Sequence, residues 1–144
     1  MKAKIVFNDL KMEIANDGKV TTRFYGELMY VIYDAPYCLL HFTDDKKYRV
    51  EATMQFVLDN LPIAFIRCNR SVILNMCYYK EYDSMLMEVK MECGKHFKLS
   101  RRHLRNFKEA RQSLPRISPP CQICYVCINE ECKNRDVFYR CKKA

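Results

Sequence analysis

The sequence predicts a mostly β-sheet fold with a short helix, a second and strongly basic helix, and a small cysteine-rich tail. Residues 5–50 are rich in β-branched and aromatic side chains, and residues 85–93 alternate from one position to the next. Helical spacing of apolar residues is confined to two segments that follow these strands. The chain has 144 residues and 49% hydrophobic content, enough to bury a core.

The first part of the chain is predicted to form successive strands. The turn signal Asn16-Asp17-Gly18 follows KMEI and is typical of a tight hairpin. The segments KVTTRFYGEL, LMYVIY and CLLHFT come next. Asp34-Ala35-Pro36 separates the last two, and Asp44-Asp45 ends that pair. We therefore expect strands joined by short turns over residues 5–50.

A short helix is predicted over residues 53–61. Apolar residues recur there at positions i, i+3, i+4 and i+7, namely Met54, Val57, Leu58 and Leu61. Thr53 is a suitable N-cap, and Pro62 ends the segment.

The alternation at residues 85–93 predicts a strand whose core-facing stripe is Met85, Met87, Val89, Met91 and Cys93. Gly94-Lys95 predicts a turn, and residues 96–99 the returning strand of a hairpin.

A basic helix is predicted over SRRHLRNFKEARQSL, with Ser100 as its cap and Pro115 as its end. Leu104, Phe107 and Leu114 are expected to face inward. The stretch PRISPP is the linker-like part of the chain. We therefore place one domain over residues 1–114, a linker over 115–120 and the tail over 121–144.

Positive charge is concentrated in one segment. The formal net charge is +8, and residues 95–116 hold eight basic residues against one acidic residue. Such a segment can be a surface that faces phosphate or a solvated helix face, and charge alone leaves both open.

A polar cluster precedes an apolar run in the stretch FIRCNRSVILN. Arg67, Asn69 and Arg70 come just before Val72-Ile73-Leu74, which has the composition of a buried strand. This order suggests that the strand is a scaffold for a loop that binds an anion. Asn75 is expected to hydrogen-bond the backbone at the strand end.

FIRCNRSVILN and FKLSRRHLRNF together resemble the paired signatures of the LytTR DNA-binding domain family. Phe65, Arg67, Arg70-Ser71, the apolar run and Asn75 fit the first signature. Gly94, Leu99 and Ser100-Arg101-Arg102 fit the second. The resemblance covers residues 10–111 and implies a largely β fold in which loops between strands, rather than a recognition helix, enter successive major grooves of duplex DNA.

The resemblance carries the DNA contacts over to particular basic residues. Arg70 and Arg102 match the two main contact positions, and Arg101 is the expected phosphate partner. A guanidinium can bind guanine O6 and N7 together and also grips phosphate. Lys98 and Arg105 are the neighbouring basic residues that we add to this interface.

The third contact implied by the resemblance comes from the loop at Pro36, which points to Tyr37 or Cys38. The chain departs from the family pattern here, because Ala35-Pro36-Tyr37 replaces a Gly-Asn-Tyr-like turn and proline stiffens the loop. It departs again at Asn69, where many members have histidine. Asparagine can still hydrogen-bond adenine or phosphate, so Asn69 is included among the predicted contacts.

The resemblance also implies a transcription regulator, and we expect a bacterial one. The expected target is promoter DNA with imperfect direct repeats that bind two copies. A receiver domain of ~120 residues does not fit in this length, so a stand-alone unit controlled by a partner protein, expression level or its own tail is expected.

The N-terminus lacks the pattern of a secretory signal, and no apolar run is long enough to insert into a membrane. We therefore expect a cytoplasmic protein with free or metal-bound cysteines.

The tail lies outside the resemblance and holds five of the nine cysteines, Cys121, Cys124, Cys127, Cys132 and Cys141. Four thiolates can form a closed zinc site, for which Cys124, Cys127, Cys132 and Cys141 would serve with Cys121 left over. An iron–sulfur cluster fits less well, because the ferredoxin run continues x3-C-P and this one does not. A dithiol switch and a reduced tail without a ligand are the remaining interpretations.

Two other classes of function are set against DNA binding. One is a metal or redox sensor whose active element is the cysteine cluster, and the other is a module whose basic helix binds an acidic protein. An enzyme is not expected, since HExxH, GxSxG and a Gly-rich phosphate loop are all missing. We expect no cofactor for DNA binding, and zinc in the tail is the cofactor that we predict in preference to an iron–sulfur cluster.

Overall fold

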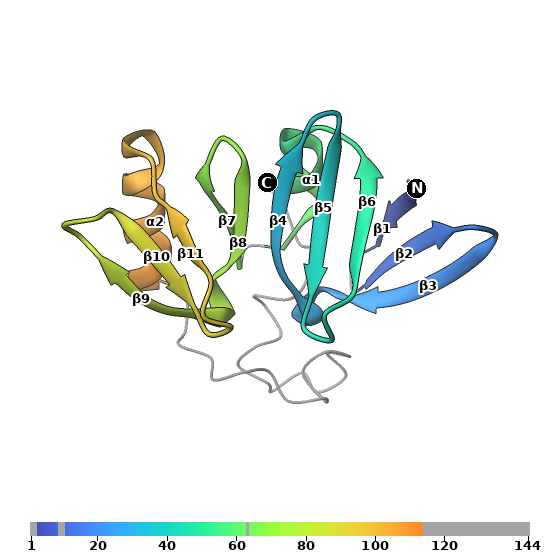
Figure 1. The fold of residues 1–144 in the computed structure, drawn as a ribbon, viewed down its shortest axis with the longest axis horizontal. Helices are drawn as coiled ribbons and strands as arrows, with labels where there is room; N and C mark the ends of the chain where they lie inside the picture. The colour runs from blue at the N-terminus through green and yellow to red at the C-terminus, as the bar shows by residue number, and fades with distance from the viewer. Residues whose placement is uncertain (1–2, 9–10, 63, 114–144) are drawn as a thin grey trace.

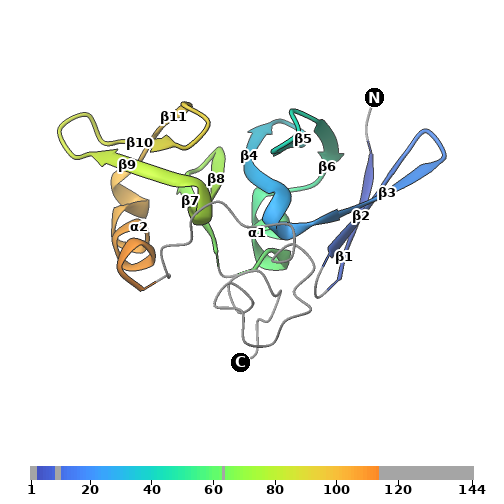
Figure 2. The same cartoon turned by 90° about the horizontal axis from the view of Figure 1, so that it is seen from below.

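A computed structural model describes residues 3–8, 11–62 and 64–113 of the protein. In this part of the chain the strands form three antiparallel sheets that lie in a row along the long axis of the molecule (Figure 1). Both helices lie on the same side of that row (Figure 2). The prediction of a mostly β fold with two short helices is confirmed.

The N-terminal sheet has the order β1-β2-β3, with β1 at Lys4–Phe7, β2 at Lys11–Asn16 and β3 at Lys19–Phe24. Asp17 and Gly18 both have positive φ, at 53° and 76°, which is the geometry of the tight hairpin turn that the sequence predicts.

The central sheet has the order β6-β5-β4-β8-β7. Its strands span Leu28–Asp34 for β4, Tyr37–Phe42 for β5, Lys47–Glu51 for β6, Phe65–Asn69 for β7 and Val72–Asn75 for β8. A short 3-10 turn, Tyr25–Glu27, leads into β4. Helix α1, Met54–Asn60, joins β6 to β7, and Thr53 Oγ1 accepts a hydrogen bond from the Phe56 N–H (3.1 Å), as an N-cap does.

The C-terminal sheet has the order β11-β10-β9, with β9 at Tyr79–Asp83, β10 at Glu88–Met91 and β11 at His96–Lys98. A 3-10 turn, Met76–Tyr78, precedes β9, and helix α2, Arg101–Ser113, follows β11. The inward position predicted for Phe107 is confirmed, since its ring is fully buried and lies 5.6 Å from that of Tyr79 and 5.1 Å from that of Tyr82.

Two buried polar residues tie together segments that are far apart in the sequence. Asn75 lies at the end of β8, where its Oδ1 accepts from the Cys77 N–H (3.0 Å) and its Nδ2 donates to the Leu28 carbonyl (2.8 Å). This confirms the backbone-binding role predicted for it. Arg23 on β3 forms a bidentate pair with Asp44, at 3.1 Å for each bond, and so ties the N-terminal sheet to the β5–β6 turn.

The strand predicted over residues 85–93 is shorter than the alternation suggests. Residues 84–87 form a turn, and β10 begins only at Glu88. Asp83 Oδ1 accepts hydrogen bonds from the N–H groups of Met85 (3.0 Å) and Leu86 (3.1 Å), and these local bonds replace strand pairing. Val89 and Met91 are buried as predicted, whereas Met85 and Cys93 are exposed.

The described part of the chain contains no helix that is long and apolar enough to cross a membrane. The predicted linker at residues 115–120 and the tail at 121–144 lie outside the described residues, and so does Leu114.

Candidate nucleic-acid interface

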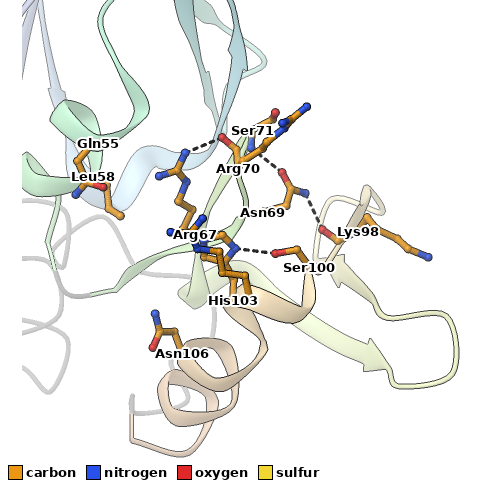
Figure 3. Close-up of a pocket in the computed structure, with 11 residues that line it drawn as sticks. Gln55, Leu58, Arg67, Asn69, Arg70, Ser71, Lys98, Ser100, His103 and Asn106 are labelled. Carbon is orange, nitrogen blue, oxygen red and sulfur yellow. Dashed lines mark hydrogen bonds between the residues drawn. The ribbon is translucent and has the colours of Figure 1, made fainter.

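The two sequence signatures meet in space where the β7–β8 turn lies against the junction of β11 with α2. The turn consists of Arg70 and Ser71, and the junction is centred on Ser100 (Figure 3). Antiparallel pairing of β7 with β8 forces the chain to reverse at Arg70, since Asn69 already pairs with Val72. The apolar run that the sequence assigns to a scaffold strand is fully enclosed as β8.

Three hydrogen bonds fix the end of β7 to this junction. The Ser100 N–H donates to the Cys68 carbonyl (3.1 Å), and the Cys68 thiol donates to the Lys98 carbonyl (3.2 Å). Asn69 Nδ2 donates to the same Lys98 carbonyl at 2.7 Å. Segments about 30 positions apart in sequence are therefore held in one rigid arrangement.

The Arg70 turn is also fixed from within. The Asn69 side chain accepts from the Ser71 N–H at 2.8 Å, and Arg67 donates from a terminal guanidinium nitrogen to the Arg70 carbonyl, also at 2.8 Å. On the other side, the Tyr33 N–H of β4 donates to the Ser71 carbonyl (2.8 Å). Arg67 thus acts as a support of the turn, while the Arg70 side chain is left exposed to solvent.

These elements border an open groove of about 700 Å³. Four basic side chains line it, together with amide, hydroxyl and imidazole groups that can donate hydrogen bonds and one apolar residue, Leu58. The lining residues are Gln55, Leu58, Arg67, Asn69, Arg70, Ser71, Lys98, Ser100, Arg102, His103 and Asn106. No acidic residue is among them. A concave, cationic and donor-rich surface of this kind suits a phosphate backbone with bases beside it.

The electrostatics of the groove act on His103. Burial lowers the pKa of its imidazole below the usual value, and the positive charges of Arg67 and Arg102 lower it further. The Ser100 hydroxyl lies 2.7 Å from His103 Nδ1, which orients the ring. The groove therefore presents a net positive field that a phosphate would neutralise.

The third predicted contact comes from the β4–β5 turn, which points to the same side of the molecule as the Arg70 turn (Figure 1). Tyr37 is half-buried, with the Arg49 guanidinium 4.4 Å from its ring centre. Cys38 is fully buried, and its thiol donates to the Ala52 carbonyl (3.3 Å). This corrects the expectation for the Cys38 side chain, because strand alternation turns it into the core, whereas Tyr37 on the opposite face stays partly exposed and its contact with DNA stays a prediction.

The other predicted basic residues are all exposed. Lys98 and Arg102 line the groove, whereas Arg101 and Arg105 lie on α2 outside its lining. Arg105 is paired with Glu109 on the same helix at 3.3 Å. The arrangement therefore brings Arg70, Lys98 and Arg102 together and leaves the other two at the margin.

Sequence reasoning did not single out four residues of the groove as interface residues, namely Gln55, Leu58, His103 and Asn106. Gln55 and Leu58 come from α1, which no local pattern connects to the two signatures. Asn106 could have been found, because it follows Arg102 by four positions and so shares its helix face.

The metal prediction rests on Cys121, Cys124, Cys127, Cys132 and Cys141, which all lie outside the described residues. Within the described ranges no cluster of three or more potential metal-ligating side chains occurs. The zinc site in the tail stays a prediction.

The fold and the groove define a class of protein: a β-sheet domain in which an arginine-bearing turn lies against the start of a basic helix. Residues 24–112 match the model of the LytTr DNA-binding domain. The chain therefore belongs to the LytTR DNA-binding domain family. It is a DNA-binding domain.

Among solved structures, the fold is similar to the LytTr DNA-binding domain of a Bacillus cereus protein described as a methyl-accepting/DNA response regulator. The TM-score is 0.63 at 18% sequence identity, over 73% of this chain and 99% of that one. No curated protein matches the chain in sequence.

Proposed function

We propose that the protein is a transcription regulator that reads promoter DNA through the Arg70 turn and the β11–α2 junction. One observation carries this proposal. The hydrogen bonds among Cys68, Asn69, Lys98 and Ser100 hold two cationic segments on one groove before any ligand binds. Binding then requires little ordering of the backbone, so more of the contact energy is retained as affinity.

Within this groove we assign base recognition to Arg70 and Arg102. Arg70 is exposed on a fixed turn, as a side chain that enters the major groove must be, and a bidentate arginine–guanine pair contributes about 1–3 kcal/mol of discrimination. Lys98, Arg101 and Arg105 are assigned to phosphate. The Asn69 amide already bonds Lys98 and Ser71, so we propose that it positions Arg70.

The proposed target is a promoter site with imperfect direct repeats that binds two copies of the chain. Phosphate contacts should make the affinity fall steeply as salt is raised. The slope of log affinity against log salt gives the number of phosphates engaged, and each removed phosphate contact should reduce it by about one.

The test is a selection of duplexes from a random pool at physiological salt, with the wild type beside Arg70→Ala and Arg102→Ala. Lys80→Ala serves as a matched control, because Lys80 is an exposed cation on β9, away from the groove lining. We expect an enriched motif for the wild type and the control, and a loss of preference at one position in each arginine variant. If both arginine variants lose only salt-sensitive affinity and no motif is enriched, the base-reading assignment is wrong.

A further inference from the structure

A small cavity lies on the side of the molecule opposite the Arg70 turn. It is bordered by the β5–β6 turn and the β10–β11 turn, which both point away from the Arg70 turn and the β4–β5 turn (Figure 1). Its volume is about 250 Å³, below the range of roughly 300–1,000 Å³ that holds drug-sized ligands, so it suits a small ligand. The lining residues are Met29, Tyr30, His41, Phe42, Asp45, Lys46, Lys47, Cys93 and Lys95.

Strand register builds one wall of this cavity. Tyr30 on β4 pairs with His41 on β5, and His41 pairs with Lys47 on β6, so the three side chains form a row on one face of the central sheet. The buried Tyr30 ring contacts the His41 ring at 4.5 Å and the Phe97 ring of β11 at 4.9 Å. This stack fixes the imidazole and joins the central sheet to the C-terminal sheet beside the cavity.

Three exposed cations from both turns line the cavity, namely Lys46, Lys47 and Lys95. Among the described residues, none of their ammonium groups forms an ion pair or a hydrogen bond. Asp45 is the one acidic residue of the lining, so three positive charges and one negative charge leave a net charge of +2. An anion in the cavity would remove the repulsion among the lysines.

Two further acidic residues are neighbours of the lining in sequence. Asp44 is engaged by Arg23 in the bidentate pair at 3.1 Å for each bond. Glu92 precedes Cys93 but lies outside the lining, and it forms no ion pair with another described residue. The positive charge of the cavity is therefore not neutralised from within the described part of the chain.

The His41 ring is affected by these charges. Burial lowers the pKa of its imidazole to about 4, and the positive charges of Lys47 and Lys95 contribute to this shift. Two of the three ammonium groups therefore act on the same ring. His41 Nε2 is buried and has no hydrogen-bond partner among the described residues, an arrangement that costs free energy until a partner is supplied.

We propose that this cavity binds a small dianion of the phosphate class, either inorganic phosphate or the phosphate group of a monoester. A dianion matches the net charge of the lining, and its several oxygens can accept from more than one ammonium group at once. The site is separate from the DNA groove, because the two linings share no residue. It therefore does not rest on the proposed function.

The test follows the imidazole resonances of the full chain by NMR while potassium phosphate replaces potassium chloride at pH 7.5 and constant ionic strength. We expect His41, assigned by its loss in His41→Gln, to shift saturably with half-saturation on the order of 1 mM. Its pKa should rise above about 4, because the anion offsets Lys47 and Lys95. His96 is exposed outside the lining and serves as the internal reference.

Matched variants locate the anion. Lys47→Gln and Lys95→Gln should each weaken phosphate binding about fivefold, because each removes one of the three positive charges. Lys80→Gln removes an exposed cation on β9, outside the lining, and should bind phosphate like the wild type. Glycerol 3-phosphate in the same titration identifies the source of the phosphate group: tighter binding than that of inorganic phosphate indicates an ester, and weaker binding indicates the free ion.

The proposal is wrong if chloride shifts His41 as far as phosphate does, or if Lys80→Gln weakens the shift as much as Lys47→Gln. It is also wrong if duplex DNA shifts His41 and phosphate does not, because the lysines would then belong to the DNA surface. A saturable His41 shift in a protein that selects no DNA motif would leave this site standing while the proposed function fails.

Discussion

The Arg70 turn and the β4–β5 turn point to the same side of the molecule, but they are built differently (Figure 1). Arg67, Asn69 and the Tyr33 backbone all bond to the Arg70 turn. The β4–β5 turn has Ala35-Pro36 at its tip, and at its base Tyr37 pairs with Asp34 and Glu51 and carries Arg49 over its ring. We therefore expect an interface residue to be identified by the hydrogen bonds that hold its turn as much as by its own charge.

The two turns offer two kinds of contact to DNA under the proposed function, a fixed cation and an aromatic ring. A fixed cation can place a guanidinium against one base, so its loss should change sequence preference. An aromatic ring on a turn without cations at its tip offers contact area, so its loss should weaken binding without redirecting it.

The largest loss of DNA affinity is expected when hydrogen bonds that hold the Arg70 turn are removed. Asn69→Leu keeps the size of the side chain and deletes its bonds to Lys98 and Ser71. We expect the free energy of unfolding to fall by about 1–2 kcal/mol. We expect DNA affinity to fall about 10- to 30-fold, because Arg70 is no longer held in its binding position.

A double-mutant cycle of Asn69→Leu with Arg70→Ala decides how Asn69 acts. If it acts by placing Arg70, the two losses of affinity are less than additive. Strict additivity would show instead that Asn69 contacts DNA on its own, as the sequence comparison with the family suggests. Fluorescence anisotropy on a single-site duplex supplies the affinities, and urea denaturation supplies the stabilities.

Much of this arrangement is predictable from sequence, because local patterns determine it. The Asn16-Asp17-Gly18 turn, the Thr53 cap and the bond from Cys77 to Asn75 follow from side chains that act within a few positions of themselves. The pairing of the two signatures is also predictable, since it comes with the family resemblance.

What the sequence could not give depends on contacts between distant segments. Cys38 was predicted as a contact because it follows the loop at Pro36, where the family resemblance places one, but the register of β5 turns it inward beside Met54 of α1. Met85 looked like a core residue because it alternates with Leu86, but the Asp83 carboxylate closes a turn there. Gln55 joins the groove only through the packing of α1 beside β7.

A smaller effect on DNA affinity is expected from pH, because the titratable His103 lines the groove beside the Arg70 turn. In the protein without DNA, the pKa of His103 lies below its usual value of 6.5, because burial and two arginines oppose its protonation. A DNA phosphate in the groove would offset those arginines and raise this pKa, so binding takes up a proton. Affinity should therefore rise, by about two- to threefold, as the pH is lowered through the pKa that His103 has in the complex.

His103→Gln should flatten this pH dependence while the Tyr37 variants retain it. The measurement is anisotropy at constant ionic strength across the pH range. An unchanged pH profile in His103→Gln would mean that another group takes up the proton, and His103 would lose its place in the interface.

The smallest effect is expected at Tyr37. Tyr37→Ala removes the ring under Arg49, so DNA affinity should fall only about twofold and the selected motif should stay the same. Tyr37→Phe keeps the ring and deletes the hydroxyl, so it should bind like the wild type. A loss as large as that of Arg70→Ala, or a change of motif, would show that the β4–β5 turn also reads bases. Rigid support from neighbouring elements would then not be the property that separates base-reading turns from the rest of this surface.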